Sequence, residues 1–429
     1  MIRSGIKLRR KRPQLESMGI VLFTVSMWMY SIFPLFSRHP FLCFTALSAV
    51  SVIYLALCSF YMETGYYVRK SNLIWLIALI PLVFSNLKDF NVFNGATILT
   101  YAFGIVFIIF CCHTTDHYEI GILTLKILVT VYILSIFFQY FSGELFGRLF
   151  SGRFDSSALS FYEASVKKHF FIGMGGSPGV ATVNCTIALA IVISFTSPHN
   201  WKSYIVKIPH LIIIFSAFIL IGKKSGMVSA AFAVMVVYLL ISSNKIWKKA
   251  GILLICTVLF CAVLYLITQI YSSSYLSLKI REGFNQLIEG RDFSSGRIYL
   301  YRNAWSEFIH HPFFGIGWSR FSPQYGNLVH NIYLQLLCET GMIGFVLFIF
   351  PALHMYFRSC KLILRLNREG SDKDLFNYMI FSLYIQSEFL FISLFENNLY
   401  MIMPLYLYFF ACGIAFTAEQ EFNVKRRKL

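Results

Sequence analysis

The chain has 429 residues, of which 57% are hydrophobic and only 13% are charged. A soluble domain of this size does not need so much apolar surface, and apolar runs of about 20 residues, long enough to cross a bilayer, recur throughout. We therefore predict an all-α, polytopic integral membrane protein whose residues 1–429 form a single transmembrane domain. The runs are continuously apolar rather than alternating, which argues against a membrane β-barrel.

In chain order, the apolar runs predict twelve transmembrane helices. The first follows a basic cluster, but it is long and lacks a small-residue cleavage site, so we interpret it as a span rather than a cleaved signal peptide. The ten cysteines lie in or beside apolar runs and indicate neither a disulfide framework nor a zinc site. The predicted spans are 18–36, 41–62, 72–86, 93–112, 120–141, 178–196, 205–221, 226–242, 251–271, 331–357, 374–395 and 399–417.

The net charge of +17 is explained first by positive-inside anchoring. The connections that share a side with the basic N-terminal cluster are themselves rich in Lys and Arg, so we predict that both termini are cytoplasmic. The opposite, outward side then holds two long loops, 142–177 and 272–330, and the tight turn Gly222 to Lys224. Nucleic acid is not an expected partner, because the basic residues are scattered over both sides.

The outward loops are also basic, which the positive-inside rule does not predict. An anionic ligand is the natural reason, because a guanidinium group binds phosphate through two donors and stays charged. Lipid head groups or nearby carboxylates are the competing explanation for each of these cations. The predicted substrate-binding residues on these segments are Arg153, Lys223, Lys224, Arg291 and Arg302, with Arg297 assigned to catalysis.

The segment His330 to Gly341, HNIYLQLLCETG, begins where the second long loop meets an apolar helix. Unperturbed imidazole titrates near pH 6.5, so His330 is suited to take a proton from a sugar hydroxyl; a helix-end histidine bonded to backbone is the alternative. Asn331, Gln335 and Glu339 form a polar stripe on one helix face. A carboxylate as deep as Glu339 usually faces a polar cavity, so we predict His330, Arg297 and Glu339 as catalytic and Asn331 as substrate-binding.

Several familiar motifs are missing from the sequence. It has no phosphate-binding Walker loop, no dinucleotide fingerprint, no HExxH and no Asp-x-Asp in an outward loop. We therefore predict no cofactor and no metal site. Protein cations would have to stabilise a charged leaving group. Gly341 and Gly344 are expected to allow a neighbouring helix to approach closely.

The segment Arg297 to Phe345 resembles the O-antigen ligase/polymerase family of bacterial envelope proteins. The shared pattern is an arginine, a tryptophan, then hP..G.G...f, then HN..L....E.G..G. In this chain the pattern falls on Arg297, Trp305, His311, Pro312, Gly315, Gly317, Phe321, His330, Asn331, Leu334, Glu339, Gly341 and Gly344.

The resemblance implies a metal-independent glycosyltransferase at the outer face of the bacterial inner membrane. Its donor would be an oligosaccharide on undecaprenyl pyrophosphate, and its other partners would be membrane lipids and a chain-length regulator protein. Carried over by position, His330 would act on the acceptor, while Arg297 and the Lys223–Lys224 pair would hold pyrophosphate.

Three activities fit this resemblance or the spans. A polymerase of O-antigen, capsule or exopolysaccharide repeat units is favoured, because ligases tend to show Arg-x-x-x-Leu where this chain has Arg297 followed by Tyr301. The alternative is a ligase that transfers the glycan to lipid A-core of lipopolysaccharide. A flippase for the lipid-linked oligosaccharide, the second alternative, predicts two related halves, which the sequence does not contain. A non-catalytic scaffold would not need His330 beside a polar helical stripe.

Overall fold

A computed structural model provides the fold of the chain. Arg291, one of the predicted substrate-binding residues, lies outside the residues that the structure describes. Within those residues every regular element is a helix. The described residues are 17–29, 32, 40–61, 73–86, 92–109, 115–195, 201–242, 244–270, 274–289, 294, 296–370 and 372–427.

Helices lie over all twelve segments that the apolar runs predict. They are the helix Ser17–Met29, α2 (Pro40–Tyr61), η2 with α3 (Leu73–Ala78 and Leu79–Asn86), α4 (Val92–Ile109), α5 (His117–Phe141), α8 (Pro178–Phe195), α9 (Trp201–Ile221), α10 (Lys224–Ile241), α11 (Ile246–Ile270), α15 (Ile332–Glu369), α16 (Lys373–Ile392) and α17 (Ile402–Arg427).

Six of these helices, α5, α8, α10, α15, α16 and α17, are long and apolar enough to cross a membrane among the described residues. This confirms the prediction of an all-helical chain with several spans. The count of twelve stays a prediction. Five further apolar helices are described over shorter stretches of 10–17 residues, among them Thr97–Ile109 and Lys207–Ile221.

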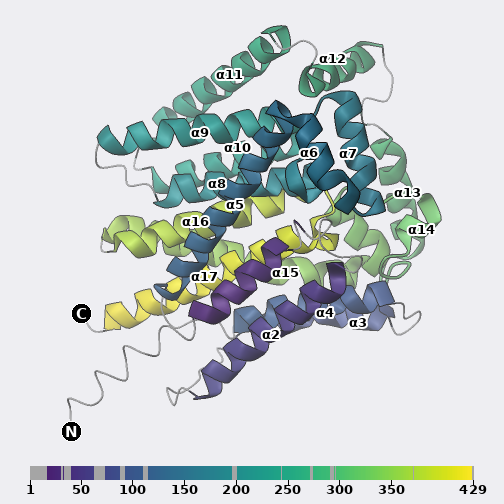
Figure 1. Cartoon of the computed structure of the whole chain (residues 1–429). Coiled ribbons are helices and arrows are strands. Elements are labelled where there is room, and N and C mark those ends of the chain that lie inside the picture. The colour runs from purple at the N-terminus through teal and green to yellow at the C-terminus, as the bar shows by residue number, and fades with distance from the viewer. Residues whose placement is uncertain are drawn as a thin grey trace.

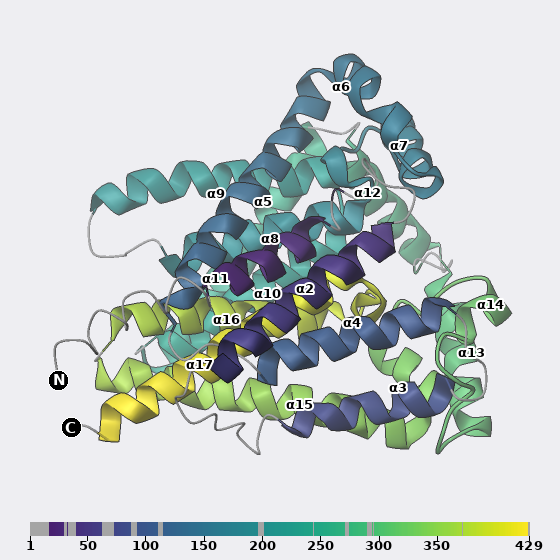
Figure 2. The same ribbon diagram turned by 60° about the horizontal axis from the view of Figure 1, so that its bottom comes forward.

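The long helices run side by side, and α17 ends at one end of this bundle (Figure 1). The opposite end carries short helices from both predicted outward loops (Figures 1 and 2). We call this the loop end. Its helices are α6 (Gly143–Phe150), α7 (Ser156–Lys168), α12 (Tyr275–Ile288), α13 (Arg297–His310) and α14 (Phe321–Tyr325). The two long loops therefore lie at the same end of the bundle, and their outward orientation stays a prediction.

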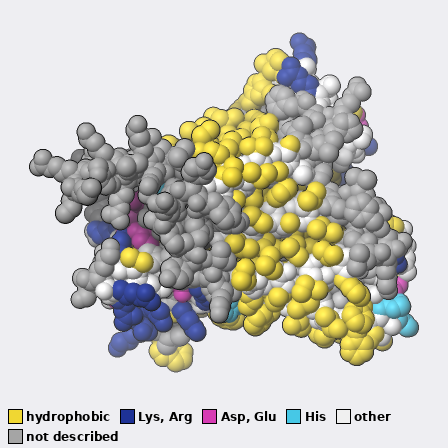
Figure 3. Space-filling view, turned by 90° about the horizontal axis from the view of Figure 1, so that it is seen from below, with side chains coloured by type: hydrophobic (Ala, Val, Ile, Leu, Met, Phe, Trp, Pro, Cys, Tyr) yellow, Lys and Arg dark blue, Asp and Glu magenta, His cyan; other side chains and the backbone are white. Residues whose placement is uncertain are grey.

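Helices α16 and α17 form the centre of the bundle. Aromatic side chains dominate this core: Tyr384, Tyr406 and Phe410 have no solvent exposure. The outer surface is apolar as well, and Figure 3 shows hydrophobic side chains over the middle of one face, with Lys and Arg gathered toward one end. On α5, for example, Leu123 and Leu134 are more than half exposed. Such a belt is stable in hydrocarbon and would be a liability in water.

Helix α15 is broken at Gly341, which has φ 65° and ψ −172°. The loop after α13 enters this break and replaces the helical hydrogen bonds that an unbroken turn would make. A Cβ on Gly341 would lie 2.3 Å from the carbonyl of Phe313. Gly344 permits close approach of Pro81, as predicted, but Gly341 instead admits the loop. The exchanged bonds include Ile316 N–H to Cys338 O at 2.8 Å, Gly317 N–H to Glu339 O at 2.9 Å and Met342 N–H to Pro312 O at 2.8 Å.

Gln139, near the end of α5, fixes the other long loop. Its Oε1 accepts the N–H groups of Ile172 and Gly173 at 2.8 and 2.9 Å, and its Nε2 donates to Ser165 Oγ at 3.1 Å. Because Gln139 is buried, these bonds cannot be exchanged for water at no cost. They hold the segment that leads into the first turn of α8.

Substitution of Gly341 by alanine tests the role of the break. G341A adds a Cβ against the Phe313 carbonyl, and it also forces a residue with a side chain into a backbone region, φ 65° and ψ −172°, that essentially only glycine adopts. Gly370 is a control for an alanine at a positive-φ glycine of the same helix, because it has φ 63° in the left-handed region and open space around its Cβ position. We expect G341A to lower the free energy of unfolding at least twice as much as G370A, measured by thermal unfolding in detergent. Equal losses would contradict the role assigned to the inserted loop.

Candidate active site

Two cations and a hydroxyl meet at one carboxylate oxygen at the loop end. Lys223 Nζ lies 3.2 Å and Arg297 Nη2 lies 3.9 Å from Glu396 Oε1. Ser225 Oγ donates a hydrogen bond of 2.9 Å to the same oxygen. Glu396 follows the end of α16 and its side chain is 8% exposed. The contacts therefore join three distant parts of the sequence in a half-buried, net positive cluster.

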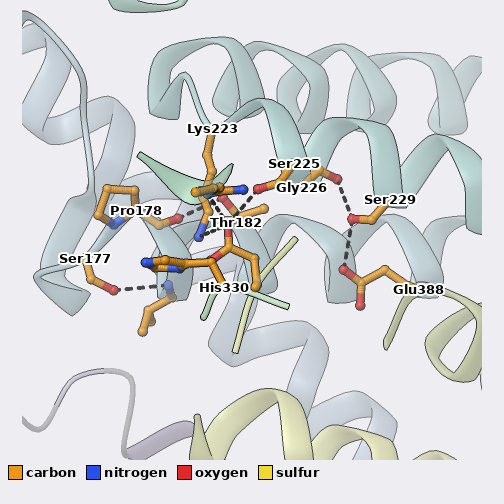
Figure 4. A network of polar contacts seen from close by, with 12 residues as sticks. Ser177, Pro178, Thr182, Lys223, Ser225, Gly226, Ser229, His330 and Glu388 are labelled. Carbon is orange, nitrogen blue, oxygen red and sulfur yellow. Dashed lines mark hydrogen bonds and ion pairs between the residues drawn. The ribbon is translucent and has the colours of Figure 1, made fainter. Parts of the chain in front are cut away.

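Four helices begin at this cluster. Lys223 immediately precedes α10, Arg297 is the first residue of α13, and His330 lies two residues before α15. The first turn of α8 is adjacent, because a Cβ on Gly179 would lie 3.3 Å from Lys223 Nζ. Figure 4 shows Lys223, Ser225 and His330 beside Ser177 and Pro178. Helix N-termini carry partial positive charge and unpaired N–H groups, so their convergence favours an anion.

The backbone of His330 is strained, with φ 58° in the left-handed region. This conformation is uncommon for a residue with a side chain and persists only where the surroundings impose it. Val329 N–H donates to the buried Oε1 of Gln335 at 2.9 Å, and Ile332 N–H donates to the carbonyl of Ser393 at 2.9 Å. Tyr301 Oη donates a long bond of 3.4 Å to the His330 carbonyl. These bonds fix the backbone on both sides of His330 and so set the position from which its imidazole extends.

The surroundings of the imidazole set its charge. Burial lowers the pKa of His330 below its usual 6.5, and the charges of Arg297 and Lys223 lower that pKa further, whereas Glu396 partly offsets the effect. The ring is therefore neutral at neutral pH. Its Nδ1 is buried and has no hydrogen-bond partner among the described residues. A neutral imidazole has one ring nitrogen that is able to accept a proton, and because Nδ1 is enclosed, a ligand hydroxyl would have to approach Nε2.

A second carboxylate, that of Glu388 on α16, is bound by a serine one turn further along α10. Ser229 Oγ donates to Glu388 Oε1 at 3.2 Å, four residues after Ser225, which donates to Glu396 (Figure 4). Two serine–carboxylate pairs therefore lie along the contact between α10 and α16. The pairing keeps a nearly buried carboxylate hydrogen-bonded inside the bundle.

Comparison with protein families identifies this part of the chain. Residues 209–349 match the family model described as O-antigen ligase. The chain carries an O-antigen ligase family domain. The match confirms the resemblance seen in the sequence and includes Lys223, Arg297 and His330 of the cluster, while Glu396 lies beyond it. Members of this family are membrane proteins that transfer glycans. No curated protein matches the chain.

Within the O-antigen ligase domain, Glu339 lies in contacts that favour a structural role over the predicted catalytic one. The residue has no solvent exposure. Its carboxylate accepts the N–H groups of Ser319 and Phe321 at 2.9 and 3.2 Å, the amide of Gln335 at 2.9 Å and the hydroxyl of Tyr400. Gln335 in turn holds Val329, the neighbour of His330. The polar stripe thus binds the loop rather than lining an open cavity.

The other predicted site residues are dispersed. Asn331 caps α15, because its Oδ1 accepts Leu334 N–H at 3.1 Å. The Lys223–Lys224 pair is divided, since Lys224 Nζ donates to the Lys279 carbonyl on α12 at 2.7 Å. Arg302 and Arg153 have exposed side chains, on α13 and after α6. Of the predicted cations in the described residues, Arg297 and Lys223 are the ones whose charges act on the His330 imidazole.

Glu396 is the site residue that the sequence did not single out. It lies in the short connection between the last two predicted spans, ENN, on the predicted outward side. That position was a usable signal, because a carboxylate in this connection faces outward loops that are otherwise basic. Its pairing with Lys223 and Arg297 depends on tertiary contacts between α10, α13 and α16.

Removal of the Glu339 carboxylate tests its structural role. E339A leaves several buried donors unpaired, each at about 1–3 kcal/mol, so we expect the free energy of unfolding to fall by at least about 3 kcal/mol. E339Q keeps an acceptor oxygen and should lose less. Glu369, exposed near the end of α15, provides the control E369A, which should be neutral. An inactive E339Q with wild-type thermal stability would instead support the catalytic assignment.

Proposed function

We propose that this protein is a polymerase of lipid-linked oligosaccharide repeat units. It transfers a glycan from undecaprenyl pyrophosphate to a sugar hydroxyl, at the outer face of the bacterial inner membrane and with both chain termini in the cytoplasm. The product would be O-antigen, capsule or exopolysaccharide. The observation that carries the proposal is the cluster of Lys223, Arg297 and Glu396 beside His330, where α10, α13 and α15 begin.

The charge of the cluster suits a diphosphate. Lys223 and Arg297 outnumber the single carboxylate of Glu396, and the adjacent helix N-termini add positive potential. Glu396 keeps the two cations near each other before the donor arrives. The more highly charged diphosphate then competes for the same cations and gains hydrogen bonds from the guanidinium group of Arg297. In this proposal the protein's own cations, without a metal ion, stabilise the leaving group.

The proposed reaction balances one bond formed against one broken. The acceptor hydroxyl oxygen attacks the anomeric carbon of the donor glycan, and the bond from that carbon to the pyrophosphate oxygen breaks. His330 accepts the hydroxyl proton, which a neutral imidazole permits. Undecaprenyl pyrophosphate leaves with the bonding electron pair, and Lys223 and Arg297 stabilise its negative charge.

A ligase that uses lipid A-core as its acceptor is the second candidate, and the description of the matching family favours it. The polymerase is preferred because Tyr301 replaces the leucine typical of ligases. Tyr301 lies at the site, where its hydroxyl approaches the His330 carbonyl. It therefore sits where it could distinguish one acceptor from another.

Alanine substitutions test the proposal in a strain that lacks the chromosomal gene. We expect H330A to slow chain extension by about 100-fold or more, the usual contribution of a general base. R297A and K223A should also abolish long glycan chains on a gel. R302A, on the same helix as Arg297, and K224A, beside Lys223, are matched controls that should retain them.

Full-length chains from H330A and R297A would refute the catalytic assignment. The strain without the gene separates the two acceptors. Loss of a polymerase leaves single repeat units attached to lipid A-core, whereas loss of a ligase leaves none attached.

A further inference from the structure

A pocket of about 460 Å³ lies at the end of the bundle opposite the candidate active site. It is formed near the first residues of α5 and α9, the last turn of α8 and the first turns of α16. Its polar lining residues are Glu119, Lys126, Lys207, His210 and Tyr378. The O-antigen transfer chemistry described above uses none of them.

Two cations from different helices enter this pocket within apolar segments. Lys126 is nine residues beyond the start of α5, about 14 Å along the axis, and Lys207 is six residues beyond the start of α9. A charged side chain at such a depth is costly unless it reaches the interface or meets a counter-charge. Neither lysine forms an ion pair with another described residue, and Glu119 at the rim is the one acidic side chain among the described residues that line the pocket.

The remaining walls of the pocket are apolar and open toward lipid. Ile120 and Leu123, on the same face of α5 as Lys126, are 47% and 53% exposed. Ile191 and Phe195 of α8 form the inner wall. A ligand that fits must therefore combine an anionic group for the lysines with hydrocarbon for these walls. A free sugar or nucleotide lacks the second property.

We propose that this pocket binds a glycerophospholipid whose phosphodiester carries a net negative charge, such as phosphatidylglycerol. Lys126 and Lys207 hold the phosphodiester, and the acyl chains lie along Ile120 and Leu123. Glu119 at the rim leaves the group with one net positive charge, which matches a single phosphodiester and disfavours more highly charged ligands. Basic pockets between transmembrane helices, on the side that the positive-inside rule assigns to the cytoplasm, recognise lipid head groups by this chemistry.

The bound lipid has a structural consequence. Helix α9 lines the pocket near its start and ends at Ile221, directly before the turn that presents Lys223. A lipid between α5 and α9 therefore restrains the helix that leads to the cluster. Binding itself does not depend on glycan transfer, so failure of the proposed function would leave this proposal standing.

The test uses delipidated full-length protein in a neutral detergent. Phosphatidylglycerol should raise the midpoint of thermal unfolding by roughly 3 °C more than phosphatidylcholine does, because a ligand that binds only the folded state stabilises it. Native mass spectrometry should detect retained phosphatidylglycerol. The variant K126Q/K207Q should lose both effects, and K126R/K207R should keep them.

The matched control is K245Q/K248Q, which removes two exposed lysines at the same end of the bundle. It should respond to phosphatidylglycerol as the wild type does. An equal response of K126Q/K207Q and wild type, or a wild type that does not distinguish phosphatidylglycerol from phosphatidylcholine, would overturn the proposal.

Discussion

The candidate site depends on one carboxylate oxygen shared between two cations. Lys223 precedes α10, Arg297 opens α13 and Glu396 follows α16, so the ion pairs close the loop end across three distant segments. In the absence of a ligand, the two cations would repel each other and the nearby helix N-termini would add to that repulsion. The carboxylate of Glu396 offsets this repulsion and still leaves an excess of positive charge. That excess, in a half-buried place, is what makes the cluster suitable for a diphosphate.

The second constraint is the loop that enters the break of α15. Gly341 interrupts the helix, and backbone groups of the loop complete its hydrogen bonds. Glu339 and Gln335 then fix the far end of the same loop, as far as Val329. His330 follows in its left-handed conformation. Most residues of the family pattern therefore hold the loop in the break of α15. His330 and Arg297 are the residues of the pattern that face the cluster.

The sequence predicted the helices well, because continuous apolar runs and their basic flanks report directly on a bilayer. It also brought together His330, Arg297 and Lys223, through the family resemblance and the unexpected outward charge. It could not predict the separation of Lys223 from Lys224, because adjacent residues at a helix start point in different directions that only α12 reveals. Helical spacing placed Glu339 on a polar helix face. That face binds a loop, and the sequence around Glu339 does not indicate that a loop packs there. Glu396 was missed for the same reason, since ion pairs across segments leave no spacing pattern.

The central claim is that Lys223 and Arg297 together bind the diphosphate of the donor lipid. Its most direct test is the equilibrium binding of undecaprenyl pyrophosphate to purified protein, comparing wild type, K223Q/R297Q and the neighbouring control K224Q/R302Q. Loss of two charge-assisted contacts at about 1.5–3 kcal/mol each predicts that the dissociation constant of K223Q/R297Q is larger by a factor of at least about 100. The control should bind within a few-fold of wild type. Equal affinity of K223Q/R297Q and wild type would contradict the account.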